Sequence, residues 1–144
     1  MGIKVFLDTN ILFDVIDVSR KNSSNVRRLF YLSEKKELSF FISAITVSNI
    51  IYVMQNKFKM EAADLKSRLR KLFQLVDVVP YDMEVIIDGL RLEFDDVEDS
   101  FQFVSALKCK SDYLVTEDRR FLQKDIRNDR IKVVNTEEFL NIML

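Results

Sequence analysis

The chain has 144 residues and almost no net charge, with 22 Lys and Arg against 23 Asp and Glu. Its length allows one hydrophobic core of ordinary size, so we expect residues 1–144 to form a single domain. It contains no histidine and one cysteine, Cys109. This excludes an internal disulfide, a zinc site of the usual Cys/His type and hydrolases that use a Ser–His or Cys–His pair. Any metal ligand or general base must therefore come mainly from carboxylates.

Short β-rich runs alternate with stretches of helical apolar spacing along the whole chain. In chain order they predict a strand at 3–7, helices at 10–16 and 25–38, a strand at 40–43, helices at 46–57 and 61–73, a strand at 75–79, helices at 83–94 and 97–110, a strand at 113–116, a short helical turn near 121, a strand at 131–134 and a final helix with a capping box at Asn135 and Glu138. The helix at 46–57 is apolar on nearly every side, which predicts burial. This alternation predicts an α/β fold with a mainly parallel central sheet covered on both faces by helices.

The longest apolar runs, such as residues 50–54, are too short to cross a bilayer, and Lys4 interrupts any signal-like N-terminus. We expect a cytoplasmic protein that does not bind membranes. Two basic stretches, residues 57–71 and 119–132, have the charge to follow a phosphate backbone. Solvated helix faces with interspersed acids explain the same clusters equally well.

Four acids are predicted to meet at one edge of the sheet. Asp8 ends the first strand, Asp118 follows the fourth, and Asp96 and Asp99 open the helix between them. In a parallel α/β sheet, ligands bind beyond the carboxyl ends of the strands. Clustered carboxylates repel each other unless a cation neutralises them, and oxygen ligands without histidine or thiol favour Mg²⁺ or Mn²⁺. Taken singly, each acid also fits a helix cap, a helical first turn or an ordinary turn.

Four segments in this order and spacing resemble the PIN-domain family, which includes the VapC-type toxins. They are "VFLDTNILFD" at 5–14, "ISAITVSNIIYVM" at 42–54, "DVEDSFQFVSALKCKSDYLVTEDRRF" at 96–121 and "VVNTEEFL" at 133–140. The resemblance covers nearly the whole chain. It implies a PIN-like three-layer α/β sandwich and metal-dependent hydrolysis of phosphodiester bonds, usually in RNA. It further implies a small antitoxin protein that screens the acidic site and, commonly, a homodimer.

The resemblance also assigns site residues. Metal-binding acids fall on Asp8, Asp99 and Asp118, with Asp96 as an additional acid, and small polar residues that orient them fall on Thr9, Asn10 and Thr116. Basic residues beside the acids are expected to hold RNA phosphates, namely Arg119, Arg120 and Lys124.

One position departs from the family pattern. Many relatives carry a glutamate where this chain has Asn49. Asparagine removes a charge, although its amide oxygen can still take part in the catalytic site with Asp8, Asp99 and Asp118; alternatively, Asn49 only satisfies polar neighbours. Two functions stay open: a metal-dependent endoribonuclease, as the toxin of a type II toxin–antitoxin pair, or a catalytically weakened domain that binds RNA or protein. A phosphatase of the haloacid-dehalogenase type fits less well, because Asn10 stands where that family has a second aspartate.

Overall fold

The computed structural model describes residues 2–35, 37–124, 126, 128 and 130–144. At its centre lies a five-stranded sheet in the order β3-β2-β1-β4-β5, and all the described strand pairs are parallel. The strands are β1 (Ile3–Leu7), β2 (Leu38–Ser43), β3 (Val76–Val79), β4 (Tyr113–Val115) and β5 (Lys132–Val134). The predicted α/β fold is confirmed, because the strands are parallel and are connected by helices. Sheets of this kind are covered by helices on both faces.

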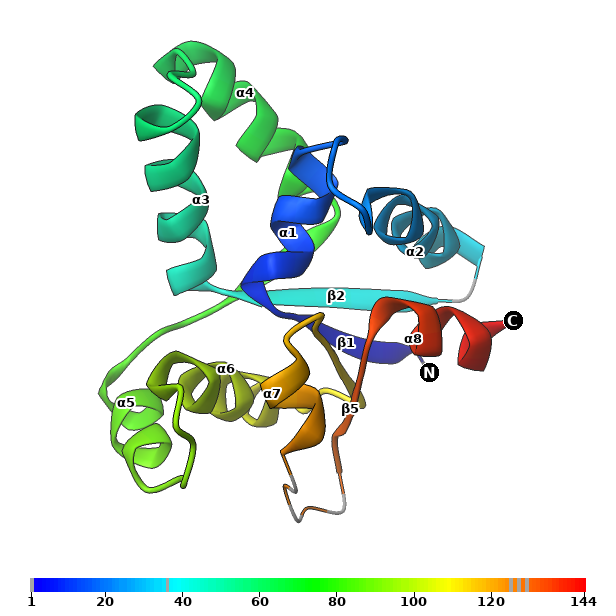
Figure 1. Ribbon diagram of the computed structural model, residues 1–144, viewed down its shortest axis with the longest axis vertical. Helices are drawn as coiled ribbons and strands as arrows, with labels where there is room; N and C mark the ends of the chain where they lie inside the picture. Colours follow the sequence, from blue (N-terminus) through cyan, green and yellow to red (C-terminus); the bar gives the residue numbers. More distant parts are fainter. Residues whose placement is uncertain (1, 36, 125, 127, 129) are drawn as a thin grey trace.

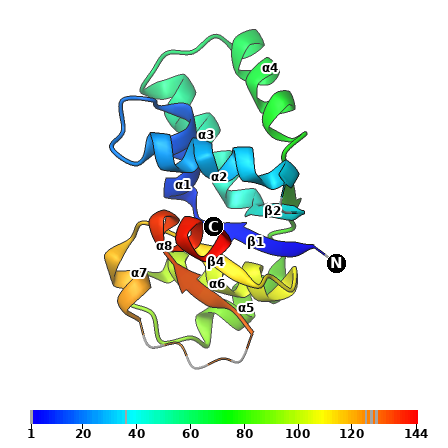
Figure 2. The same ribbon diagram turned by 90° about the vertical axis from the view of Figure 1, so that its right-hand side faces the viewer.

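Helices cover both faces of this sheet. They are α1 (Thr9–Ile16), α2 (Ser23–Lys35), α3 (Ala44–Asn56), α4 (Ala62–Leu72), α5 (Met83–Leu90), α6 (Val97–Lys108), α7 (Arg119–Gln123) and α8 (Thr136–Met143). Figures 1 and 2 show α1 to α4 on one side of the sheet and α5 to α7 on the other, while α8 packs against α2. No helix within the described ranges is long and apolar enough to span a membrane.

The strands divide their side chains between two cores. In β1, Val5 and Leu7 belong to the core under α1 to α3, whereas Phe6 belongs to the core under α6 and α7. Successive side chains of a strand point to opposite faces, so a fully apolar strand fills both cores. Asp8 comes directly after this buried strand and inherits its burial, with 5% of its surface exposed.

Besides shifts of one or two residues at other element ends, three predicted features differ from the structure. The predicted helix at 25–38 ends at Lys35 because Glu37 has a left-handed backbone (φ 53°) and Leu38 already pairs with Ile3 in the sheet. The predicted helix at 83–94 ends at Leu90, and the chain then turns so that Phe94 packs edge to face on Phe121, with ring centroids 5.6 Å apart.

The third concerns α3, which is not buried on every side. It buries Thr46, Ile50 and Met54 along one stripe, but Tyr52 on its outer face is 68% exposed. The sequence is misleading here because an apolar outer residue does not require a covering element.

Candidate metal centre

Asp8 is held at the carboxyl end of β1 by four hydrogen bonds. Its Oδ1 accepts from the backbone N of Thr9 at 2.8 Å and from Nε2 of Gln102 at 3.0 Å. Its Oδ2 accepts from Oγ1 of Thr116 at 2.7 Å and from Nδ2 of Asn10 at 3.2 Å. Burial raises the pKa of Asp8, and the bonds from Gln102, Thr116 and Thr9 oppose that rise. The carboxylate is therefore fixed in one orientation.

Three polar residues tie this carboxylate to the neighbouring elements. Gln102 of α6 has no exposed surface, and its Nε2 also lies 3.2 Å from the hydroxyl of Thr9 and 3.3 Å from that of Thr46 in α3. The two hydroxyls are 2.7 Å apart. Sequence reasoning missed Gln102 and Thr46, although a glutamine inside the apolar run "FQFVSAL" of a core helix was a usable signal, because buried polar groups need partners.

Three other carboxylates converge beside Asp8. One oxygen each from Asp96, Asp99 and Asp118 lies within 4.8 Å of the others. Asp96 caps α6 by accepting from the backbone N of Glu98 at 3.0 Å, and Asp118 caps α7 by accepting from that of Arg120 at 2.9 Å. Such a group of oxygens has the spacing and chemistry that a hard divalent cation needs. Asp8 lies near these acids and raises the pKa of Asp99 through its charge, but it is not one of the three whose oxygens come within 4.8 Å of one another.

Asp99 is the buried member of this cluster, and its pKa is raised by burial and by the other acids. It is 8% exposed, and among the described residues no hydrogen bond reaches its carboxylate. Burial first, and then the charges of Asp8, Asp96, Asp118 and Glu98, raise the pKa of Asp99 to about 8. A divalent cation would reverse this cost by replacing carboxylate repulsion with attraction. The donor set, all carboxylate oxygen, therefore fits Mg²⁺ or Mn²⁺.

Asn49 contacts an acid that sequence reasoning quoted but did not assign. Its Nδ2 lies 3.3 Å from Oε1 of Glu98. Burial, followed by the charges of Asp8 and Asp96, raises the pKa of Glu98, which the bond from Asn49 opposes. The described hydrogen bond of Asn49 thus points to the α6 acids rather than to Asp8. Glu98 of α6 therefore places a carboxylate beside the neutral side chain of Asn49 in α3.

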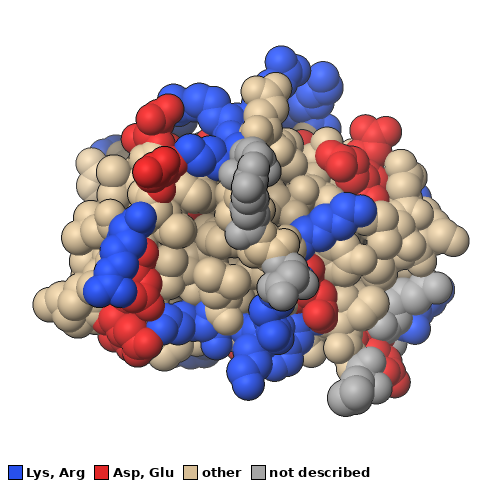
Figure 3. Space-filling view, turned by 90° about the horizontal axis from the view of Figure 1, so that it is seen from below, with Lys and Arg blue, Asp and Glu red and all other residues tan. Residues whose placement is uncertain are grey.

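The predicted RNA-binding residues fall on two sides of the acids. Arg120 and Lys124 line a hollow of about 230 Å³ together with Asp96, Asp99 and Phe94, whereas Arg119 lines a separate pocket. Figure 3, which views the molecule from below in the orientation of Figure 1, shows Lys and Arg interspersed with Asp and Glu rather than one continuous basic face. Basic and acidic side chains are therefore mixed over this face.

Comparisons with known proteins identify the family of this chain. Residues 4–120 match the family described as the PIN domain. Over 141 residues the chain is 24% identical to Ribonuclease VapC1 of Aquifex aeolicus (strain VF5), with 94% of this chain and 92% of that protein covered.

Two solved structures share the fold. VapBC2 from Rickettsia felis, bound to a DNA fragment from its promoter, has a TM-score of 0.65 at 17% identity and covers 91% of this chain and 98% of its own. VapC20 from Mycobacterium tuberculosis, described as a toxin that cleaves the sarcin–ricin loop, has a TM-score of 0.64 at 14% identity, with 88% and 98% covered. The predicted family is confirmed: this chain belongs to the PIN-domain family, and VapC-type ribonuclease toxins are among its relatives.

Proposed function

We propose that the protein is a metal-dependent endoribonuclease that acts in the cytoplasm as the toxin of a type II toxin–antitoxin pair. The observation that carries the proposal is the convergence of Asp96, Asp99 and Asp118 within 4.8 Å, next to the buried Asp8, at the carboxyl edge of the sheet. The name of the relative from Aquifex aeolicus, Ribonuclease VapC1, supports the same substrate class.

The side chains divide the work between holding a cation and placing RNA. Asp96, Asp99 and Asp118 would hold Mg²⁺ or Mn²⁺, with Asp8 contributing charge from its fixed orientation. When bound, the ion would lower the pKa of a water molecule and neutralise charge on the phosphate. Arg120 and Lys124, which share a hollow with Asp96 and Asp99, would hold phosphates that the acids alone would repel.

The orientation of Asp8 is the task of the neighbouring polar residues. Thr116 bonds to both Asp8 and the backbone N of Asp118, at 2.7 and 3.1 Å. Asn10 bonds to Asp8 through its Nδ2 and accepts from the backbone N of Glu117 at 3.2 Å. These contacts join the end of β1 to the turn after β4. They therefore hold Asp8 and Asp118 at a fixed distance from each other.

Asn49 supports a second candidate function, a PIN domain that binds RNA or protein but cuts weakly. In our proposal Glu98 supplies the charge that Asn49 lacks, and Asn49 positions Glu98. Asn49→Glu would then place a second carboxylate against Glu98 and give no gain in cleavage. Glu98→Gln would reduce cleavage, whereas a large gain with Asn49→Glu would identify the native site as weakened.

The primary test is cleavage of mixed RNA substrates with Mn²⁺ and with EDTA. We expect cleavage that requires the metal and is lost in Asp99→Asn. The matched control is Asp77→Asn, which removes an exposed aspartate from β3, outside the cluster. Absence of metal-dependent cleavage by the wild type, or equal rates in Asp99→Asn, would contradict the proposal.

The proposed partners are RNA, an antitoxin protein and a second copy of the chain. The related Rickettsia felis structure is of VapBC2 on promoter DNA, which motivates the antitoxin. Co-expression with the product of the adjacent gene is expected to give a complex in which RNA cleavage is suppressed, and light scattering of the isolated chain is expected to give twice the mass of 17.0 kDa. A monomeric mass would contradict only the proposed dimer and would leave the other two proposed partners untouched.

A further inference from the structure

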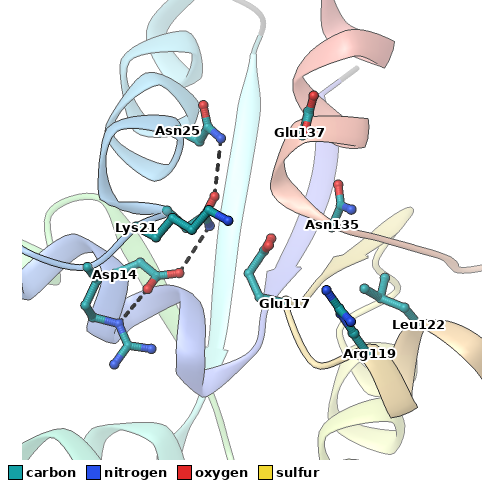
Figure 4. A pocket seen from close by; sticks show the side chains of 10 residues that line it. Asp14, Lys21, Asn25, Glu117, Arg119, Leu122, Asn135 and Glu137 are labelled. Carbon is teal, nitrogen blue, oxygen red and sulfur yellow. Dashed lines mark hydrogen bonds and ion pairs between the residues drawn. The ribbon is translucent and has the colours of Figure 1, made fainter.

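A second pocket opens on the other side of the turn that carries Asp118. It measures about 640 Å³ and lies between the α1–α2 connection, the start of α2, the turn after β4 and the start of α8 (Figure 4). This volume is in the range of small-ligand sites, and polar side chains from four segments point into it. Nothing in the proposed metal chemistry uses this pocket.

An ion pair between the buried Asp14 and the exposed Arg20 builds part of the pocket wall. Asp14 of α1 is 3% exposed, and its Oδ1 lies 2.6 Å from Nε of Arg20, while its Oδ2 accepts from Nδ2 of Asn22 at 3.1 Å. Asn22 is also 3.1 Å from Oγ1 of Thr136, which donates to Glu117 at 2.9 Å. A connected network of this kind fixes the α1–α2 connection against the turn after β4 and the start of α8. The pocket is therefore preformed.

The groups left to a ligand are of mixed type and include the exposed carboxylate of Glu137 at the start of α8. Within the described part of the chain, Lys21 and Arg119 form no ion pair with a carboxylate. Asn25 donates to Asn22 through its Nδ2, which leaves its carbonyl oxygen as an acceptor, and Leu122 adds an apolar wall. Cations suit a phosphate, whereas an amide acceptor beside an apolar surface suits the edge and face of a nucleobase.

The turn after β4 connects this pocket to the acid cluster. Glu117 and Arg119 line the pocket, whereas Asp118 belongs to the cluster and Arg120 to the hollow beside it. Consecutive residues thus serve two neighbouring sites. We propose that the pocket binds the nucleotide next to the cleaved phosphodiester. Asn25 would contact the nucleobase of that nucleotide, and Lys21 and Arg119 would contact its phosphate. This inference rests on the proposed ribonuclease function and makes the pocket the part of the site that selects the RNA sequence.

The test is RNA binding without metal, so that it does not depend on cleavage. Four labelled pentanucleotides that differ in one base are titrated in EDTA at several salt concentrations. Arg119→Gln should flatten the slope of log K against log salt by about 0.7 and weaken binding about fivefold at 0.1 M salt, for every base alike. Lys21→Gln should do the same. Asn25→Leu should leave the slope unchanged and shrink the preference among bases about fivefold or more.

The control is Arg28→Gln, an exposed arginine on the same helix as Asn25 that does not line the pocket; it should change neither slope nor preference. If Arg119→Gln and Lys21→Gln behave like this control, the inference is overturned even where the wild type cleaves RNA. If the wild type never cleaves but binds with a base preference that shrinks in Asn25→Leu, the ribonuclease proposal fails; the pocket is then an RNA-binding site without a place next to a cleaved bond. Equal affinity for a free nucleoside monophosphate, with the same loss in Arg119→Gln, would instead make the pocket a free-nucleotide site and refute its assignment to the RNA strand.

Discussion

Metal binding should compete with a proton on Asp99, and this gives the sharpest test of the site. The pKa of Asp99 is raised to about 8 by burial and by its acidic neighbours, so the metal-free protein keeps this carboxyl protonated at pH 6. A cation binds the ionised form, and its binding must release the proton. We therefore expect the affinity for Mn²⁺ to rise steeply between pH 6 and pH 8.

The size of the effect follows from that pKa. About 1% of metal-free molecules carry ionised Asp99 at pH 6 and about half at pH 8, so the apparent affinity should rise about 50-fold. Mn²⁺ at about 100 times its Kd at pH 8 adds about 2.7 kcal/mol of stability. For a chain of this size that raises Tm by about 5–10 °C, against about 1–3 °C for the same Mn²⁺ concentration at pH 6. Thermal unfolding with and without Mn²⁺ measures both values.

Without metal, the stability of the folded chain should fall as pH rises. Because the pKa of Asp99 is raised in the folded state above its ordinary 3.8, the folded chain holds more protons than the unfolded one between about pH 4 and pH 8, and stability falls as pH rises through this window. Asp99→Asn removes that loss, so this variant should be more stable than the wild type at pH 8 in EDTA and show little response to Mn²⁺. An equal Mn²⁺ shift in Asp99→Asn, or a wild-type shift independent of pH, would refute the assignment of Asp99 as a ligand.

Three further predictions concern single contacts. Gln102→Leu, which removes the 3.0 Å donor to Asp8, should lower Mn²⁺ affinity or cleavage about 10–100-fold, measured by titration and by rates. Asn135→Ala removes the side-chain oxygen that caps α8 by accepting from the backbone N of Glu138 and should cost about 1 kcal/mol in urea unfolding. Gly89→Ala places a Cβ against the ring of Phe101; crowding of about 2 kcal/mol, less the higher helix propensity of alanine, should leave a net loss of about 1 kcal/mol in the same assay.

The sheet edge at which the acids lie was predictable from the strand topology. Asp8 and Asp118 follow strands, and parallel strands deliver their following residues to the same edge of the sheet. Helix ends were less predictable: α5 ends at Leu90, and Phe94, inside the predicted helix, instead packs against Phe121, a contact between residues 27 positions apart in the sequence. Local spacing carries no information about such a partner.

The links between the acids depend on the same kind of distant contact. Gln102 reaches Asp8 across 94 positions and Asn49 reaches Glu98 across 49. A single sequence gives the residue types but not these pairings. The pocket on the other side of the turn is still harder to predict, because its wall joins Asp14, Asn22 and Thr136, whose polarity alone also fits ordinary turns and helix ends.

Helix capping and metal binding first stood as competing explanations for the same aspartates, and the structure shows why they are not alternatives. Asp8, Asp96 and Asp118 are each the N-cap of a helix, α1, α6 and α7. In Asp96 and Asp118 the oxygen that accepts a backbone N–H fixes the carboxyl group, so capping orients the second oxygen without using it; in Asp8 the second oxygen accepts from Thr116 and Asn10. Asparagine caps as well as aspartate, whereas alanine costs about 0.5–2 kcal/mol. For Asp96 and Asp118, substitution by asparagine therefore keeps the helix start and removes the charge, so a loss of metal binding in these two variants reports on the site and not on the fold. In Asp8→Asn an amide nitrogen would also face the donors of Gln102, Thr116 or Asn10.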